Sequence, residues 1–170
     1  MENHENFHEN STSLIFYLRT MTQIALIDDH KIFCDSLASL INDFEGFSVS
    51  WCAQDGRKAI QLLENAQQVP DIILLDIKMP VMSGLEVAKW LFENKKEIKV
   101  LALTTEEDDN TVIQMLQYGI KGYLLKNMGA EELLIALQQA VKFGYSYTPI
   151  ITDIIHRQIE KRIINGNAPE

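Results

Sequence analysis

Hydrophobic residues are arranged along this chain as short continuous runs that alternate with segments of helical spacing. Each run is followed by a stretch in which apolar residues recur every three or four positions, as on one face of a helix. Runs that are apolar throughout indicate strands buried on both faces of a parallel sheet. The runs predict five strands, at Gln23–Asp28, Phe47–Ala53, Ile72–Leu75, Ile98–Thr104 and Lys121–Leu125.

Helices are expected between these strands. Gly46, Gly119 and Gly144 stand where three of them should end, and Val69-Pro70 is expected to end another. Right-handed crossovers leave few topologies for a chain that alternates strand and helix. We therefore expect an α/β, flavodoxin-like fold, in which a five-stranded parallel sheet of order 2-1-3-4-5 carries helices on both faces.

Four of the predicted strands end in polar residues that can handle phosphate. In the order 2-1-3-4-5 these four strands are contiguous, while the second strand, which ends in Ala53, lies at the edge of the sheet. Sites of open α/β sheets lie at the carboxyl ends of the strands. We therefore expect one crevice lined by Asp28-Asp29-His30, Asp76, Thr104-Thr105 and Lys126.

Three carboxylates in one crevice raise one another's pKa and destabilise the fold unless a cation joins them. Mg²⁺ suits a site with few carboxylates and several waters, so Asp28, Asp29 and Asp76 are predicted to bind it. The alternative is that Asp28-Asp29 is a solvated loop end, and the third carboxylate on a neighbouring strand argues against it.

Asp76 follows four apolar residues and can attack a phosphoryl group to form an acyl phosphate. The Lys126 ammonium would neutralise charge on the transferring oxygens, and the Thr104 hydroxyl could donate a hydrogen bond to one of them. Phosphoryl transfer is usually assisted by this kind of positioning and charge stabilisation. Asp76, Thr104 and Lys126 are therefore the predicted chemical residues.

With these residues in place, the chain resembles the receiver domain of two-component response regulators. The resemblance covers roughly residues 22–144 and implies that Asp76 accepts a phosphoryl group from a phosphohistidine on a sensor histidine kinase. It rests on Asp28-Asp29, on Asp76 with Met79-Pro80 and Gly84, on Thr104, and on Gly122-Tyr123-Leu124-Leu125-Lys126.

The resemblance also implies ligands and a switch. Asp29 and Asp76 would bind Mg²⁺ directly, Asp28 would bind it through water, and the backbone carbonyl of Lys78 would complete the protein ligands. Thr104 and Tyr123 look like the switch pair, in which the hydroxyl moves toward the phosphate and the ring turns inward. No other cofactor is implied.

The motifs look most like the LuxR/NarL-type subfamily, whose members carry a C-terminal helix-turn-helix DNA-binding domain. Asn127 departs from the usual pattern, and we expect this change to be harmless. The chain stops at Glu170, so contact with DNA is expected only through a domain that is not in it. A fragment of a transcription factor and a stand-alone receiver acting through protein contacts both stay open. Phosphorylation is expected to permit a homodimer.

Composition limits the function classes. The chain has 170 residues, 46% hydrophobic and 23% charged, and a net charge of −9 disfavours direct binding of nucleic acid. Cys34 and Cys52 lack metal or redox spacing and indicate buried or half-buried thiols in a reducing compartment. No apolar run reaches transmembrane length. We expect a cytoplasmic protein without membrane contact.

Three regions are predicted along the chain. Residues 1–21 form a leader expected to be disordered, in which His4 and His8 are more easily explained as solvated than as metal ligands. Residues 22–144 form the receiver, and residues 145–170 form a linker or dimer helix and tail. In this last region Ile151, Ile155, Ile159 and Ile163 recur every four residues, which fits either packing on the receiver or a contact with another domain or copy.

The competing predictions are enzymatic or nucleotide-binding. An aspartyl-phosphate phosphohydrolase would place its nucleophile after the first strand and would carry a cap, whereas Asp76 follows the third strand. A flavin or nucleotide module would need a phosphate-binding loop where Asp28-Asp29 stands. We therefore expect no enzymatic activity beyond the chain's own phosphorylation and dephosphorylation. A Lys78–Glu106 ion pair above the phosphate is predicted to slow that dephosphorylation.

Overall fold

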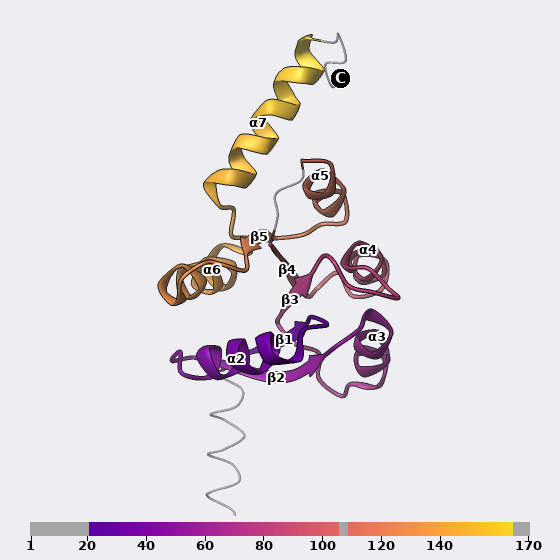
Figure 1. The fold of residues 1–170 in the computed structure, drawn as a ribbon, viewed down its shortest axis with the longest axis vertical. Helices are drawn as coiled ribbons and strands as arrows, with labels where there is room; N and C mark the ends of the chain where they lie inside the picture. The colour runs from indigo at the N-terminus through magenta and orange to yellow at the C-terminus, as the bar shows by residue number, and fades with distance from the viewer. Residues whose placement is uncertain (1–20, 106–108, 165–170) are drawn as a thin grey trace, which may run out of the picture.

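The computed structural model describes residues 21–105 and 109–164. They form a parallel sheet of five strands in the order β2-β1-β3-β4-β5, with helices on both sides (Figure 1). The predicted fold class and strand order are confirmed. The strands are β1 (Thr22–Ile27), β2 (Phe47–Ala53), β3 (Ile72–Asp76), β4 (Lys99–Thr104) and β5 (Gly122–Leu125).

Helices α2 and α6 cover one face of the sheet, and α3, α4 and α5 cover the other (Figure 1). The helices are α2 (Lys31–Asn42), α3 (Gly56–Asn65), α4 (Gly84–Asn94), α5 (Asp109–Gln117), α6 (Ala130–Phe143) and α7 (Pro149–Ile164). The expectation that Val69-Pro70 ends the second of these was wrong, because α3 ends at Asn65. Leu63 is its last core residue, and the backbone of Ala66 is already extended.

The sheet divides the core into two layers, one on each face. Along β3 every residue is buried, and Leu74 pairs with Leu26 of β1 and with Leu101 of β4. Each fully buried leucine or isoleucine contributes roughly 1.5–3 kcal/mol relative to an exposed one. The centre of the sheet is therefore a rigid platform for the residues that follow its strands.

A capping box fixes the start of α4, close to the end of β3. The Ser83 hydroxyl accepts a hydrogen bond from the Glu86 N–H at 3.3 Å, and the Glu86 carboxylate accepts one from the Ser83 N–H at 2.8 Å. These hydrogen bonds hold the pKa of Glu86 below its usual value. Such a reciprocal pair satisfies two N–H groups that a helix start otherwise leaves open.

Helix α7 starts beside β5 and projects beyond the sheet (Figure 1). Ile151 and Ile154 are buried in the core layer that contains α5, and Arg157 pairs with Asp109 of α5 at 2.9 Å. The first turns of this helix therefore pack on the receiver, which is one of the two alternatives predicted for it. Further along, Ile159 is 51% exposed, and a linker or dimer role stays a prediction.

Several predictions concern residues outside the described part of the chain. They are the disordered leader with His4 and His8, the side chain of Ile163, and Glu106 as a partner of Lys78. Within the described part, no helix combines the length and the hydrophobicity needed to cross a bilayer.

Candidate functional site

The polar strand ends meet at the carboxyl edge of the sheet, as their positions in the sequence predict. Asp28 follows β1, where its N–H still donates to the Ala53 carbonyl of β2 at 3.0 Å. Asp76 is the last residue of β3, and the next N–H, that of Ile77, donates to Leu103 of β4 at 3.2 Å. Both carboxylates are buried, with Asp28 2% and Asp76 3% exposed.

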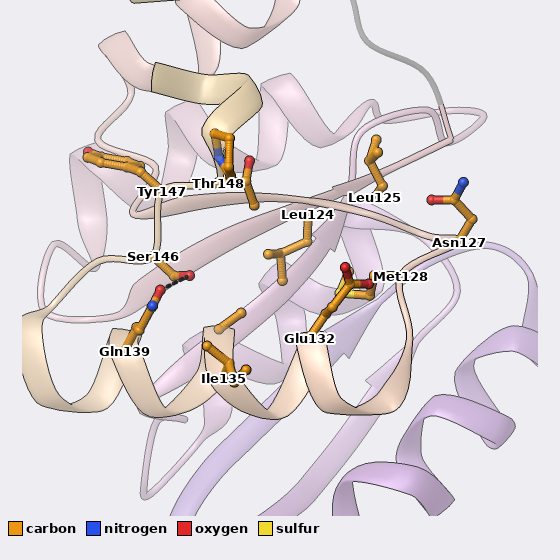
Figure 2. Close-up of a pocket in the computed structure, with 12 residues that line it drawn as sticks. Leu124, Leu125, Asn127, Met128, Glu132, Ile135, Gln139, Ser146, Tyr147 and Thr148 are labelled. Atoms are coloured by element: carbon orange, nitrogen blue, oxygen red, sulfur yellow. Dashed lines mark hydrogen bonds between the residues drawn. The ribbon is translucent and has the colours of Figure 1, made fainter. Parts of the chain in front are cut away.

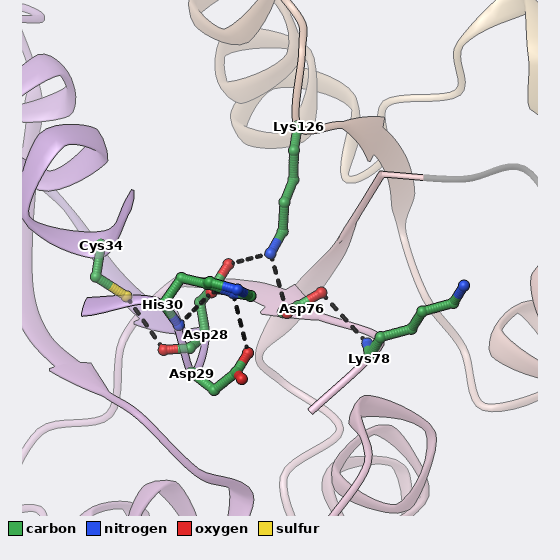
Figure 3. Close-up of polar contacts among 7 residues, drawn as sticks. All are labelled: Asp28, Asp29, His30, Cys34, Asp76, Lys78 and Lys126. Carbon is green, nitrogen blue, oxygen red and sulfur yellow. Dashed lines mark hydrogen bonds and ion pairs between the residues drawn. The ribbon is translucent and has the colours of Figure 1, made fainter. Parts of the chain in front are cut away.

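Lys126 links these two carboxylates, as Figure 3 shows. Its Nζ lies 2.6 Å from Oδ2 of Asp28 and 2.9 Å from Oδ2 of Asp76. The side chain is only 11% exposed, and its ammonium also lies 4.9 Å from the centre of the Phe33 ring. The aromatic face adds a cation–π contact to the two ion pairs. Lys126, which directly follows β5, is thus held between the two carboxylates and the Phe33 ring of α2.

Charge in the cluster remains unbalanced. Burial raises the pKa of Asp76, the charge of Asp28 adds to that effect, and hydrogen bonds from Lys126 and the Lys78 backbone offset part of it. Burial would lower the pKa of Lys126, but hydrogen bonds to Asp28 and Asp76 outweigh it and raise the value. Lys126 is therefore protonated at neutral pH, and one ammonium faces two buried carboxylates with Asp29 next to them.

The residues present fit a hard divalent cation. Asp28, Asp29, His30 and Asp76 each offer a ligand atom, and these atoms all lie within 4.8 Å of one another. Oδ1 of Asp29 is buried and accepts no hydrogen bond from the described residues. A buried carboxylate oxygen without a donor is costly unless a cation binds it. Carboxylate oxygens in this number are typical ligands of Mg²⁺.

Lys78 lies directly after the cluster. Its backbone N–H donates to Oδ1 of Asp76 at 3.3 Å, while its side chain extends away from that carboxylate (Figure 3). The two oxygens of Asp76 are therefore held separately, one by this N–H and the other by Lys126. The role of the Lys78 carbonyl as a metal ligand stays a prediction, as does the Lys78–Glu106 ion pair.

Thr104 and Tyr123 are both buried, on neighbouring strands. The Thr104 carbonyl accepts a hydrogen bond from the Lys126 N–H at 2.7 Å, so the two predicted phosphate contacts are fixed to each other through the backbone. The Tyr123 ring lies in the core layer that also holds Ile151 and Ile154 of α7. Their action as a switch pair stays a prediction.

The packing of Gly84 against Asp76 could not be foreseen from the sequence. A Cβ atom at this position would collide with the Asp76 carbonyl oxygen and lie 2.7 Å from Cα of Ile77. The Gly84 N–H donates to the Ile77 carbonyl at 2.9 Å. The start of α4 thus lies directly against the backbone of Asp76, and only glycine fits there.

Two further residues, Phe33 and Cys34, contact the site in ways that their sequence context does not predict. Phe33 is one of the apolar residues at helical spacing, which gives no hint of its contact with Lys126. The Cys34 thiol donates to the Asp28 carbonyl at 3.5 Å, and burial raises its pKa to about 12. Cys34 is buried and Cys52 half-buried, which confirms the prediction of buried or half-buried thiols.

A separate hollow of about 530 Å³ lies between the end of β5, α6 and residues 146–149 (Figure 2). It adjoins the cluster through Leu125 and Asn127, which flank Lys126. Its walls are largely apolar, and Ser146 and Gln139 in its lining hydrogen-bond each other at 3.0 Å. Its lining contains none of the carboxylates of the cluster, so the two sites are chemically distinct.

Residues 24–138 match the family model described as the response regulator receiver domain. The chain is 32% identical over 148 residues to the transcriptional regulatory protein DegU of Brevibacillus brevis, a match that covers 87% of this chain and 61% of DegU. It is 33% identical over 152 residues to the nitrate/nitrite response regulator protein NarL of Escherichia coli K12, covering 86% and 69%. The chain thus spans about three fifths of the length of the DegU relative.

Solved structures agree with these matches. A LuxR-family two-component response regulator from Aurantimonas sp. SI85-9A1 superposes with a TM-score of 0.72 at 25% identity, covering 81% of this chain and 97% of that one. The receiver domain of a NarL regulator from Mycobacterium tuberculosis gives 0.66 at 29% identity, covering 72% and 97%.

Proposed function

The chain belongs to the response regulator receiver family, and from this premise we propose that Asp76 is its phosphoacceptor. One observation supports this proposal most strongly. Asp76 is a buried carboxylate at the end of the central strand β3, 2.9 Å from an ammonium that is itself nearly buried. A structural ion pair alone would not explain the second carboxylate on the same ammonium or the third one beside it, Asp29, whose buried Oδ1 accepts no hydrogen bond from the described residues.

In the proposed reaction a carboxylate oxygen of Asp76 attacks the phosphorus of a phosphohistidine. The O–P bond forms, the N–P bond breaks, and the electron pair stays with the imidazole of the kinase. Lys126 would stabilise charge on the transferring oxygens, and the Thr104 hydroxyl would donate a hydrogen bond to one of them. A Mg²⁺ ion held by Asp28, Asp29, Asp76 and the Lys78 carbonyl would supply further positive charge.

Covalent turnover in this proposal is limited to the chain's own phosphorylation and dephosphorylation. Members of the receiver family are generally phosphoacceptors rather than enzymes. The position of Asp76 at the end of β3, rather than after β1, argues against a phosphohydrolase of the aspartyl-phosphate type. Thr104 and Tyr123 would carry the phosphorylated state to the surface as a switch pair.

The output is proposed from the relatives. DegU and NarL are regulators whose lengths this chain covers only in part. We propose that the protein is cytoplasmic and that its phosphorylation by a sensor histidine kinase controls transcription, with a helix-turn-helix domain outside these residues making the contact with DNA. Homodimerisation on phosphorylation fits this output. A stand-alone receiver that acts through protein contacts is the second candidate, and the net charge of −9 accords with both.

The test is direct phosphorylation. The protein is incubated with Mg²⁺ and acetyl phosphate and then analysed by intact mass spectrometry for a single phosphate adduct. Asp76→Asn should abolish the adduct. Asp35→Asn should retain it, because Asp35 is an exposed partner of Lys31 in α2. An adduct that persists in Asp76→Asn would overturn the assignment, and continuous phosphate release from many substrates would favour the phosphohydrolase.

A further inference from the structure

The Lys126 ammonium faces the ring of Phe33 as well as the carboxylates of the cluster. Its Nζ lies over the ring, 4.9 Å from the ring centre, and 2.9 Å from Oδ2 of Asp76. We infer that Phe33 is a positioning residue for phosphoryl transfer, because its ring holds the Lys126 ammonium beside Asp76. This inference rests on the proposed function and adds to it a residue that acts through Lys126.

The ring replaces water on one side of the ammonium. An ammonium has three N–H donors. Two acceptors lie close to this one, namely Oδ2 of Asp28 at 2.6 Å and Oδ2 of Asp76 at 2.9 Å. The Lys126 side chain is only 11% exposed, so water reaches little of it. A cation–π contact is stronger at such a desolvated site than on an open surface.

The start of α2 holds the ring in this place. Phe33 is the third residue of α2 and is half-buried against the core layer on that face of the sheet. The next residue, Cys34, is fully buried, and its thiol donates to the Asp28 carbonyl at 3.5 Å. The first turn of α2 is therefore fixed to the backbone of a carboxylate that pairs with Lys126. The ring and that carboxylate are held as one unit.

A small hollow of about 160 Å³ borders both Phe33 and Lys126. Its other walls include Leu37, Met128 and Leu133. A water molecule needs only about 15 Å³ of such space. A smaller side chain at position 33 would extend the hollow toward the ammonium, and water could then hydrogen-bond to Lys126 and draw it away from Asp76. The ring thus keeps a charge in place where transfer needs it fixed.

Ordinary core packing is the alternative role for Phe33. The residue shares its helical spacing with Leu37 and Leu40, as any apolar helix face does. In that case another apolar side chain of similar size would serve equally well. The two roles therefore differ in what leucine and tyrosine do at this position. Leucine keeps the apolar character without an aromatic face, whereas tyrosine keeps the face, and the adjoining hollow leaves space for its hydroxyl.

The experiment compares Phe33→Leu and Phe33→Tyr with the parent protein. Phe44→Leu is the matched control, because Phe44 is also half-buried against the same core layer but lies beyond the other end of α2. Intact mass spectrometry follows the initial rate at which acetyl phosphate and Mg²⁺ form the single phosphate adduct. Without the donor, nuclear magnetic resonance of ¹⁵N-lysine-labelled protein observes the Lys126 ammonium, whose signal is assigned by its absence in Lys126→Arg.

The inference predicts that Phe33→Leu is phosphorylated about fivefold more slowly than the parent, while Phe33→Tyr and Phe44→Leu stay within about twofold. Protons over an aromatic face resonate upfield, so the Lys126 ammonium signal should move downfield and exchange faster with water in Phe33→Leu alone. A parent-like rate or an unchanged Lys126 signal in Phe33→Leu would overturn the inference.

An equal loss of rate in Phe33→Tyr or Phe44→Leu would also overturn it, because the effect would then come from packing rather than from the aromatic face. These outcomes leave the phosphoacceptor untouched as long as the parent forms the adduct. Absence of the adduct in the parent would instead overturn the proposed role of Asp76 and, with it, the role of Phe33 in transfer.

Discussion

The Nζ atom of Lys126 lies 2.9 Å from Oδ2 of Asp76, so the proposed phosphoacceptor is already paired with a cation in this structure. The same ammonium lies 2.6 Å from Asp28. A phosphoryl group on Asp76 would carry its own negative oxygens toward Lys126 and weaken the pair with Asp28. Asp28 and a phosphoryl group on Asp76 would therefore compete for the same Lys126 ammonium.

Replacing Lys126 by methionine should make the stability of the protein depend on divalent cations. The variant keeps most of the aliphatic side chain but leaves Asp28 and Asp76 buried without their ammonium. Breaking a buried ion pair by removing one partner typically costs about 3 kcal/mol or more. Urea denaturation at pH 7 in a chelator should show a loss of this size in the free energy of unfolding, and excess Mg²⁺ should restore part of it.

The control for this change is Lys31→Met, because Lys31 forms an exposed ion pair with Asp35 one turn along α2. Exposed pairs of this kind contribute little to stability, so no cation-dependent loss is expected. If Lys126→Met were as stable as the parent in the chelator, Lys126 would not balance the buried carboxylates in solution.

The stability of the protein should also depend on pH through Asp76. Burial raises the pKa of this carboxyl above its ordinary value of 3.8, so the folded state holds the proton more tightly than the unfolded chain does. Ionisation therefore destabilises the fold as the pH rises from about 3.8 through the folded pKa, and the penalty is complete above that pKa. Without metal, Asp76→Asn should be more stable than the parent at pH 7, and this advantage should shrink in acid.

Urea denaturation of both proteins in a chelator, from pH 3.5 to pH 8, measures this difference. Adding Mg²⁺ at pH 7 should reduce the advantage of Asp76→Asn, because the cation stabilises the ionised parent. A difference in the free energy of unfolding that stays constant over the whole pH range would contradict the assignment of the penalty to Asp76.

Much of the fold and the site could be predicted because both depend on strongly patterned positions. Continuous apolar runs marked the strands, and the polar residues that follow them converge because strand order brings their ends together. The family match then confirmed the resemblance that Asp76, Lys126 and their neighbours suggested. The roles of such residues can be predicted from the sequence because their chemistry does not depend on the details of side-chain packing.

Contacts that depend on packing could not be predicted in this way. Phe33 has the spacing of an ordinary core residue, and nothing in the sequence shows that its ring faces the Lys126 ammonium. Helix α3 ends at Asn65, two residues after its last buried side chain, Leu63, and only the packed structure shows this. The burial of Ile151 and Ile154 against α5 likewise depends on the path of the chain after β5.

Gly84→Ala should displace Asp76, the proposed phosphoacceptor. The new methyl group would collide with the Asp76 carbonyl oxygen, a backbone atom that cannot shift without moving the chain around it. Overpacking of this kind costs about 2 kcal/mol, and displacement of Asp76 should slow its phosphorylation by acetyl phosphate. Gly129→Ala is the matched control, because a Cβ there meets only the Glu132 carboxylate at 3.9 Å. Equal rates and stabilities for the two variants would show that the contact at Gly84 yields without affecting the site.

Ile154→Ala and Ile159→Ala should separate the two parts of α7. Ile154 is buried in the receiver core, and truncating a buried isoleucine to alanine costs about 2–5 kcal/mol. Ile159 is 51% exposed, so its truncation should change the free energy of unfolding by less than about 0.5 kcal/mol in the monomer. Urea denaturation at low protein concentration measures both values. Two equally small effects would mean that α7 does not pack on the receiver in solution. A loss at Ile159 that appears only at high protein concentration would instead indicate that the outer part of α7 joins two copies of the chain.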